Sequence, residues 1–411
     1  MPKHHRRAHR RAHRRRTPLR TAALALGCAL LALPPGAAAA APAGPGVPVD
    51  LLRRVGDRLV LETVTAPGAA AAERLADELD ADPAVSSAEP RTTYRLTPTA
   101  GERLGGPLLL ATDPYLRYAT HLDEIAAPAA WATTTGRGVT VAVLDSGVDP
   151  TAPDLAGRVL PGANLAAGTD IGTHGTQVAT VVAGARGNAH GAIGVAPEVE
   201  VLPVRVCTPD GCAGDAVARG ILWAADHGAE VLNLSLGGET YSRVTADAVQ
   251  YAIGKGVVVV ASAGNSGDRG NPVEYPASYP GVVSVSASAA GGGAAPWAQH
   301  NDSVDLSAPG EQVVVGGPAA EGHAYFLARG TSFSAPQVAA AAALVRSVNT
   351  TATAAQVEGF LEATAAPRPS WPAGYGAGML DVAAAVRAAA TPVTTSSPAP
   401  VVPRRTRTPR A

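Results

Sequence analysis

The sequence predicts an α/β fold: a parallel sheet with helices on both faces, preceded by a smaller α+β unit. Three observations predict it. Five short segments between residues 139 and 288 are continuously apolar, helical stretches alternate with them, and an Ala-rich run follows at 328–348. Continuously apolar strands are covered on both faces, which is typical of parallel sheets flanked by helices. In such sheets, functional side chains gather at the carboxyl ends of the strands.

Residues 1–42 predict an export signal. Residues 1–20 hold nine Lys or Arg and no acid, and an apolar stretch at 21–33 and a run of small residues follow. This order is typical of a secretory signal peptide, and we expect cleavage near residues 38–43. The apolar stretch is too short to remain as a membrane span. General and twin-arginine export both stay open, and Cys28 leaves a lipoprotein site open.

Residues 43–112 predict a small unit followed by a linker. Residues 58–64 alternate as a strand, 70–81 have helical spacing, and 84–97 resemble two further short strands. Such a small unit buries little core of its own, so we expect it to depend on a partner domain. The Gly/Pro-rich residues 98–112 predict an exposed linker that is open to cleavage.

The large domain is expected over residues 113–390. Its predicted helices include 214–227 and 243–254, and its predicted strands are 139–145, 199–206, 231–237, 257–264 and 281–288. Residues 391–411 are basic and rich in Pro, Thr and Ser, which predicts a disordered tail with no membrane span.

Charge is distributed unevenly along the chain. The formal net charge is -1, but nine basic residues lie in 1–20 and four in 404–410. The rest of the chain holds the other 20 basic residues and all 34 acidic ones. This acidic balance argues against nucleic-acid binding by the folded part. The basic tail predicts association with an anionic cell envelope.

Three residues are candidates for chemistry. Ser332 stands at the start of the Ala-rich run, where free N–H groups of a helix carry partial positive charge. Asp145 ends the first apolar strand, and His174 precedes another helix of small residues. Each has a structural alternative: a helix cap for Ser332, a solvated loop acid for Asp145 and a structural histidine for His174.

Five motifs resemble those of the subtilisin-like serine proteases, or subtilases. They are VAVLDSGVD (141–149), GTHGTQVA (172–179), NLSLGG (233–238), VVVVASAGN (257–265) and GTSFSAPQVA (330–339). The chain order Asp, His, Ser distinguishes this family from other carriers of the same triad. The resemblance covers roughly residues 110–390, and GTSFSAP is also similar to the mycosin branch. It implies a three-layer subtilisin-like catalytic domain.

The resemblance implies a role for each matching residue. Asp145, His174 and Ser332 would form the triad of a secreted serine endopeptidase, and Asn265 with the Ser332 N–H would form the oxyanion hole. An extended protein or peptide substrate would pair with an edge strand, and pockets would set specificity. The substrate-binding residues would be Ser235, Leu236, Gly237, Ala261, Ser262, Ala263 and Gly264. Residues 43–112 would act as a cleavable propeptide that inhibits the enzyme.

Glu274 departs from the family pattern, in which a small residue commonly precedes Tyr-Pro at the base of the specificity pocket. A carboxylate there predicts a preference for Lys or Arg before the scissile bond. The alternative is a loop acid that faces water. Cys207 and Cys212 are separated by a Pro-Asp-Gly turn, a spacing that a disulfide can close, and an exported protein permits one.

The chemistry implied by the resemblance needs no cofactor. Asp154 and Asn188 match a structural calcium site of the family, although their loop offers few acidic ligands. Two other function classes stay open. One is a catalytically silent subtilase-like binding protein. The other is a lipase or esterase, which predicts a G-x-S-x-G motif with Ser first in the triad, and neither feature fits this sequence.

Overall fold

The computed structural model describes residues 46–96, 100–104 and 113–391. The predicted signal peptide (1–42), most of the predicted linker (98–112) and most of the predicted tail (391–411) lie outside the described residues. Within the described part, no helix is both long and apolar enough to cross a membrane.

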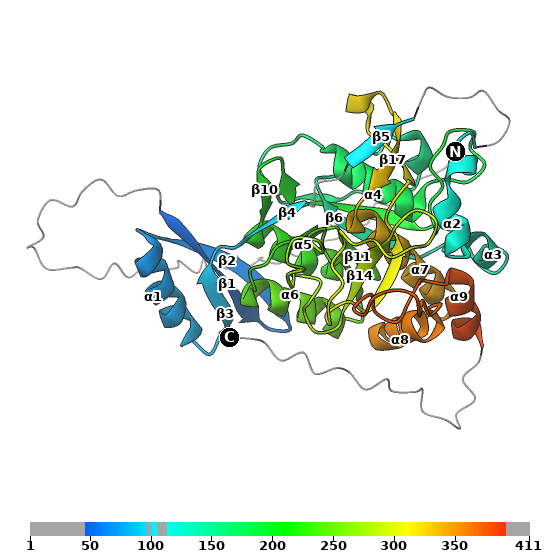
Figure 1. The fold of residues 1–411 in the computed structure, drawn as a ribbon. Helices are drawn as coiled ribbons and strands as arrows, with labels where there is room; N and C mark the ends of the chain where they lie inside the picture. The colour runs from blue at the N-terminus through cyan, green and yellow to red at the C-terminus, as the bar shows by residue number, and fades with distance from the viewer. Residues whose placement is uncertain (1–45, 97–99, 105–112, 392–411) are drawn as a thin grey trace, which may run out of the picture. The chain divides into compact units, whose positions relative to one another are not determined.

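A parallel sheet forms the centre of the large domain (Figure 1). Every neighbouring pair in it is parallel. In spatial order its strands are β15 (Leu306–Pro309), β14 (Val282–Ser288), β13 (Val258–Ser262), β11 (Val231–Leu234), β6 (Thr140–Asp145), β8 (Glu200–Arg205) and β7 (Ala163–Asn164). The predicted fold class is thereby confirmed.

Successive residues of these strands face two different cores, which makes the domain three-layered. Val141 and Val143 of β6 belong to the cluster that contains the buried residues of α4 (Thr173–Ala183) and α7 (Thr331–Val348). Ala142 and Leu144 belong to the cluster that contains those of α5 (Gly214–Asp226) and α6 (Arg243–Gly254). Helices therefore cover both faces of the sheet, as the continuously apolar strands predict.

Helix α7 is buried from its first residue to Arg346, which explains its composition. It contacts five strands of the sheet as well as α4 and α9 (Val382–Ala390). Alanine side chains let these elements approach the helix closely and keep its propensity high. Gly330 precedes the helix with a φ of 145°, a conformation that L side chains rarely adopt.

Each of the five predicted strands is present, but one is divided between two sheets. The predicted strand 231–237 becomes β11 in the central sheet and β12 (Leu236–Gly237) in another. Strands β7 and β15 were not predicted: β7 has two residues, and Ser and Pro interrupt the apolar pattern of β15. Short edge strands carry little periodic signal.

The N-terminal unit contains one more strand than the sequence pattern predicts. Its sheet has the order β2-β1-β3, with β1 (Val47–Val55), β2 (Arg58–Ala66) and β3 (Val85–Pro90), packed on α1 (Ala69–Asp80). Strand β1 escapes prediction because Pro48 and Asp50 interrupt its apolar pattern. Asp50 is buried, and its carboxylate pairs with the guanidinium of Arg91 at 2.8 Å.

A second sheet joins this unit to the large domain. Strand β4 (Thr93–Leu96) lies between β12 and β10 (Gly211–Ala213), antiparallel to both. Beyond β10 lies β9 (Cys207–Thr208). The predicted disulfide is present: Cys207 and Cys212 are opposite each other in this hairpin and are joined at an S–S distance of 2.05 Å.

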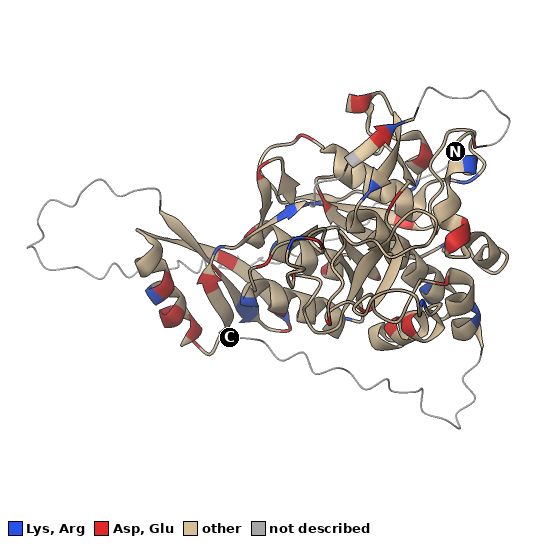
Figure 2. Ribbon diagram, viewed as in Figure 1, with Lys and Arg blue, Asp and Glu red and all other residues tan. Residues whose placement is uncertain are grey.

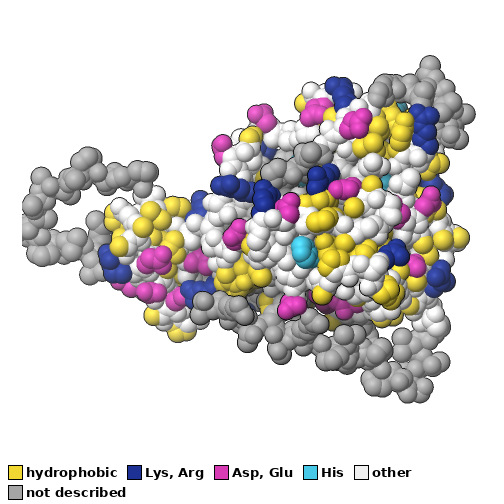
Figure 3. Space-filling view, in the orientation of Figure 1, with side chains coloured by type: hydrophobic (Ala, Val, Ile, Leu, Met, Phe, Trp, Pro, Cys, Tyr) yellow, Lys and Arg dark blue, Asp and Glu magenta, His cyan; other side chains and the backbone are white. Residues whose placement is uncertain are grey.

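A third sheet has the order β16-β17-β5, formed by β16 (Val313–Gly316), β17 (Tyr325–Arg329) and β5 (Ala100–Arg103). The remaining elements are short helices and α8: η1 (Leu116–Tyr118), α2 (Thr120–Glu124), α3 (Ala127–Ala130), η2 (Pro153–Leu155), η3 (Ala319–Glu321) and α8 (Ala354–Thr364). Acidic and basic residues are interspersed over the ribbon and on the face seen in the space-filling view (Figures 2 and 3).

The packing of α7 predicts that it will not tolerate a larger residue. In a Ser332→Ala background, Ala341→Leu should lower the free energy of unfolding by about 1–3 kcal/mol, because the added atoms have no space between helix and sheet. Denaturant unfolding measures this change. The control is Ala355→Leu, at an exposed position of α8. Equal stability of the two variants would contradict the packing described here.

Candidate active site

Asp145 is the last residue of β6, at the carboxyl edge of the sheet. Its side chain is fully buried. The N–H of Ser146 donates a hydrogen bond of 2.7 Å to Oδ1. A buried carboxylate needs such donors, because the charge has lost its hydration.

His174 is the second residue of α4 and supplies the other donor. Its Nδ1 lies 2.9 Å from both carboxylate oxygens of Asp145. Its Nε2 is buried and makes no hydrogen bond to any described residue. In the tautomer whose Nδ1–H donates a hydrogen bond to this carboxylate, the neutral ring keeps a lone pair on Nε2.

Ser332 is the second residue of α7 and is buried. Its Oγ lies 3.4 Å from the carbonyl oxygen of Ser235, and its own carbonyl accepts the Ser235 hydroxyl at 2.9 Å. The ring of the next residue, Phe333, contacts the His174 ring with a centroid distance of 5.7 Å. The structure thus joins Asp145 to His174 and places the residue after Ser332 beside the His174 ring, while Ser332 Oγ faces the carbonyl oxygen of Ser235.

Asn265 lies in the turn after β13, and Thr331 anchors it to the start of α7. Its Oδ1 accepts hydrogen bonds from the N–H and the hydroxyl of Thr331, at 3.0 and 2.9 Å. The Thr331 hydroxyl in turn accepts from the N–H of Gly264 at 3.2 Å. With its oxygen occupied in this way, Asn265 keeps Nδ2 as the group it can offer to a ligand.

The predicted substrate-binding residues lie on two segments that flank Glu274. Leu236 and Gly237 form β12, directly after Ser235, and Ala261 and Ser262 end β13 before Ala263 and Gly264. Ala261 packs in the same hydrophobic cluster as Leu234. Both segments therefore lie at the carboxyl ends of β11 and β13, two neighbouring strands of the central sheet.

The carboxyl group of Glu274 occupies the space between these two segments. A Cβ atom built on Gly237 would stand 2.6 Å from Glu274 Oε2, and one on Gly264 would stand 2.5 Å from the carboxyl carbon. Gln299 donates a hydrogen bond of 2.6 Å to Oε1. Burial raises the pKa of Glu274 to about 7, against the opposing effect of this hydrogen bond. Glu274 is thus not a loop acid in open water.

Residues 136–378 match the pattern of the Subtilase family, which is more than half of the chain. This chain belongs to the subtilase family. Family membership makes it a serine-type hydrolase of peptide bonds, and the resemblance seen in the sequence motifs is confirmed.

Known subtilases resemble the chain in sequence. It is 38% identical to Subtilisin BL of Lederbergia lenta over 258 residues, covering 62% of this chain and 92% of the relative. It is also 38% identical to fervidolysin of Fervidobacterium pennivorans, covering 57% of this chain and 38% of the relative. The chain therefore spans less than half the length of fervidolysin but most of the length of the subtilisin.

Solved structures resemble it as well. The crystal structure of fervidolysin, described as a keratinolytic enzyme related to subtilisin, gives a TM-score of 0.70 at 26% identity and covers 87% of this chain and 62% of that one. A protease from Pseudoalteromonas arctica gives 0.63 at 32% identity, covering 68% of this chain and 99% of that one.

The predicted calcium residues of this subtilase do not fit a cation. The carboxylate of Asp154 accepts hydrogen bonds from Asn188 Nδ2 and from the N–H groups of Gly191 and Ala192, at 2.8, 3.2 and 3.1 Å. The Asn188 oxygen accepts from the His190 N–H at 3.0 Å. Calcium needs free oxygen ligands, whereas this loop presents N–H donors to its carboxylate. Burial also raises the pKa of Asp154.

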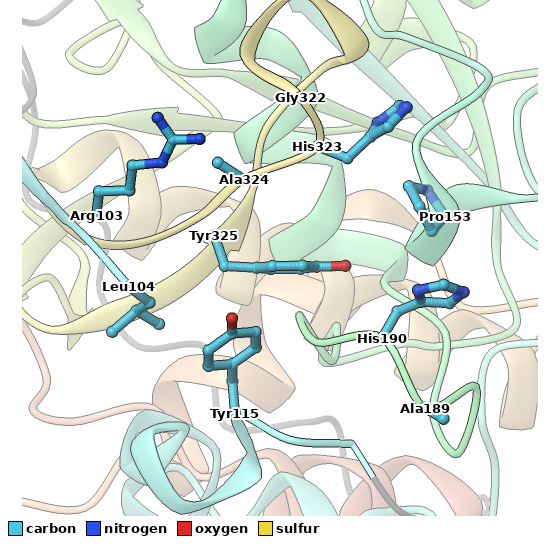
Figure 4. A pocket seen from close by; sticks show the side chains of 10 residues that line it. All are labelled: Arg103, Leu104, Tyr115, Pro153, Ala189, His190, Gly322, His323, Ala324 and Tyr325. Atoms are coloured by element: carbon cyan, nitrogen blue, oxygen red, sulfur yellow. The ribbon is translucent and has the colours of Figure 1, made fainter. Parts of the chain in front are cut away.

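A cavity and a cluster of three carboxylates are not part of the proposed active site. A cavity of about 260 Å³ lies beside the start of β17 (Figure 4). The rings of Tyr115 and Tyr325 line it and lie against each other, with their centroids 4.8 Å apart. None of the predicted catalytic residues lines it. The carboxylates of Asp305, Glu358 and Glu362 offer oxygens within 4.8 Å of one another, but acidic groups alone do not define a metal site.

Sequence reasoning missed two residues at the site. Thr331 lies within a recognised motif but is not assigned a role there, and Gln299 lies in no recognised motif. A hydroxyl residue directly before Ser332 is a weak signal for an anchor, because such residues are also ordinary helix caps. Nothing in the local pattern around Gln299 predicts its contact with Glu274, 25 residues away.

The contacts of Thr331 predict a test. Thr331→Val removes the hydroxyl that holds Gly264 and Asn265 but keeps the side-chain shape. We expect kcat on a peptide substrate to fall by about tenfold, the effect of roughly 1.4 kcal/mol, with KM changed less. Thr331→Ser keeps the hydroxyl and should stay close to wild type. If both variants behave alike, the hydroxyl does not position the Asn265 turn.

Proposed function

We propose that this subtilase is an exported serine endopeptidase that uses Asp145, His174 and Ser332 and is made as a zymogen. One observation carries the proposal. A buried carboxylate holds Nδ1 of His174, while the opposite nitrogen makes no hydrogen bond within the described part of the chain and its ring lies beside the start of the helix that carries Ser332.

Proton transfer follows from that arrangement. His174 takes the proton of the Ser332 hydroxyl as Oγ attacks the substrate carbonyl, and it returns the proton to the leaving amine. Asp145 fixes the tautomer and stabilises the imidazolium. The Ser332 hydroxyl must turn from the Ser235 carbonyl toward Nε2, which is consistent with the looser hydrogen bonds common before substrate binds.

Negative charge then develops on the former carbonyl oxygen, and two groups can receive it. The backbone N–H of Ser332 lies in the first turn of α7, so no carbonyl oxygen of the same helix is placed to accept it. Nδ2 of Asn265 is the second donor. A side-chain donor of this kind contributes about 3 kcal/mol, a magnitude known from a subtilisin. The resulting acyl-enzyme is hydrolysed by water through the same groups.

Strand β4 supports the proposed mode of peptide binding. It pairs Leu96 with Leu236 and Arg95 with Gly237, antiparallel to the predicted substrate strand β12. On its other side it pairs with β10, which the disulfide ties to β9. An extended protein or peptide substrate would add as a strand in the same way, read through its main chain.

The same contacts support a propeptide role for residues 43–112. Glu89 accepts hydrogen bonds from the Ser242 hydroxyl and, at 2.8 Å, from the N–H of Arg243 at the start of α6. Arg91 lies 3.1 Å from the Asp215 carboxylate in the first turn of α5. Both acids lie at helix N-termini, where negative charge is favourable. Such a unit would assist folding and block the cleft.

Strands β4 and β5 pair with segments that lie close to the proposed catalytic residues in the fold or in the sequence. Strand β4 ends at Leu96 on the side of Ser235, and β5 pairs Ala100 with Arg329, three residues before Ser332. We therefore propose that the chain remains inactive until it is cut within the predicted linker. The mature enzyme would begin in the range 99–113.

Glu274 supports a preference for Lys or Arg before the scissile bond. Its carboxyl group lies between the two segments proposed to line the main pocket, where an ionised form could pair with a cationic side chain. Export, and retention at an anionic envelope through the basic tail, are proposed from the sequence alone. Calcium is not part of the proposed function, since the Asp154 loop does not fit it.

The proposed chemistry can be tested on Ser332. A fluorophosphonate probe should label the wild-type protein, and Ser332→Ala should lose both labelling and casein hydrolysis, by roughly 10⁶-fold in kcat. N-terminal sequencing should find the wild type cut within 99–113 and the variant uncut. Ser334→Ala, two residues further along the buried helix, is the matched control. A folded wild type without labelling or turnover would instead indicate a catalytically silent binding protein.

The pocket predicts a pH-dependent preference. The ratio of kcat/KM for a Lys peptide to that for a Met peptide should rise as pH passes about 7, because Glu274 ionises there. Glu274→Gln should lower this ratio about tenfold at high pH, the loss expected for a charge-assisted pair. The control is Glu200→Gln, an exposed acid at the start of β8. A ratio that is unaffected by Glu274→Gln would refute the preference.

A further inference from the structure

Gln299 lies outside every recognised motif and yet touches both the Asn265 turn and Glu274. It is fully buried in the connection between β14 and β15. Its backbone N–H donates to the Gly264 carbonyl at 3.1 Å, and its carbonyl accepts the Ser286 hydroxyl at 2.6 Å. The main chain of this residue is therefore held on two sides, which limits the positions open to its side chain.

Its hydrogen-bond partners set the orientation of the side-chain amide. The backbone N–H of Ser266, the residue after Asn265, lies 2.7 Å from Oε1. A backbone N–H can only donate, so it requires the amide oxygen at that position. The NH₂ group must then face Glu274, whose Oε1 accepts from it at 2.6 Å. One amide thus bridges the turn of the proposed oxyanion hole and the base of the proposed pocket.

Gly264 makes this bridge sterically feasible. A Cβ atom at position 264 would stand 2.5 Å from Gln299 Nε2 and 2.5 Å from the Glu274 carboxyl carbon. The φ of Gly264 is 113°, in the region that favours glycine. A larger residue would separate the amide from the carboxyl group.

We propose that Gln299 is a positioning residue that holds the Asn265 turn and the Glu274 carboxyl group with one amide, and thereby sets discrimination between cationic and neutral side chains before the scissile bond. The inference rests on the proposed function of Asn265 and Glu274. It adds a residue that touches neither the substrate nor the reacting atoms.

The electrostatics around Glu274 give the amide its effect on specificity. A donor aimed at a carboxylate favours the ionised form, so Gln299 lowers the pKa of Glu274 against the larger effect of burial. The charged groups that act on Glu274 are Glu239, after β12, which raises its pKa, and Arg269, which lowers it. Arg269 also donates to the Asn265 carbonyl at 2.8 Å, so it belongs to the same turn.

Two substitutions separate the functions of the bridge. Gln299→Met has similar size and loses both side-chain hydrogen bonds. Gln299→Glu keeps an acceptor for the Ser266 N–H but places a second acid against Glu274. The full chain would be assayed after processing, with Lys and Met peptides, from about pH 5.5 to 9. Gln250→Met, which removes an exposed amide from α6, is the matched control.

In Gln299→Met, kcat on the Met peptide should fall by about tenfold. The pH midpoint, at which the Lys-to-Met ratio of kcat/KM is half-way through its rise, should move upward by at least half a pH unit. Gln299→Glu should move the midpoint further while keeping kcat on the Met peptide within about threefold. Wild-type kcat and midpoint in both variants would overturn the inference. If Glu274→Gln leaves the Lys-to-Met ratio unchanged, the proposed preference for Lys or Arg is wrong. The effect of Gln299→Met on kcat for the Met peptide then decides whether Gln299 positions the Asn265 turn.

Discussion

The buried contact between Asp145 and His174 is the constraint on which the site depends. A carboxylate without water is costly, and here the Ser146 N–H and the imidazole compensate it. The two donors fix where α4 must begin relative to the end of β6. Because α4 packs on α7, the same constraint also places Ser332. The need of one buried carboxylate for hydrogen-bond donors therefore constrains the positions of α4 and α7, which lie far apart in the sequence.

Backbone geometry at the carboxyl edge of the sheet supplies the rest of the site. The carboxyl ends of parallel strands lie at the same edge of a sheet, so the segments that follow β6, β11 and β13 lie close together there. Thr331 then joins the Asn265 turn to α7, and Ser235 joins the end of β11 to the carbonyl of Ser332. These hydrogen bonds fix the relative positions of the Asn265 turn, the end of β11 and the start of α7.

The N-terminal unit pairs with β12, the strand that we propose binds the substrate. It adds β4 to β12 and directs Glu89 and Arg91 to the N-terminal turns of α6 and α5. Leu52 and Leu59 join the core that also contains the buried residues of these helices. A unit with so small a core of its own gains stability from these contacts. The folding assistance and the blockage of the cleft that we propose for this unit would therefore have one physical origin.

The sequence by itself determined the elements whose signal is local. Continuous apolar runs predicted the five main strands, the Ala-rich run predicted α7, and the motif order identified the family and drew attention to Asp145, His174 and Ser332. The spacing of Cys207 and Cys212 was likewise enough to predict their bridge. Each of these inferences depends on residues that are close in the chain or on a recognised motif.

Only the tertiary structure decided which distant groups meet. It divided the predicted strand 231–237 between two sheets, because Leu236 and Gly237 pair with β4. It surrounded the carboxylate of Asp154 with N–H donors where a calcium ligand was expected, and it joined Gln299 to Glu274. Periodicity reports which face of an element is buried, but not which polar group lies opposite. Such partners are set by the packing of whole elements, so no local pattern could have predicted them.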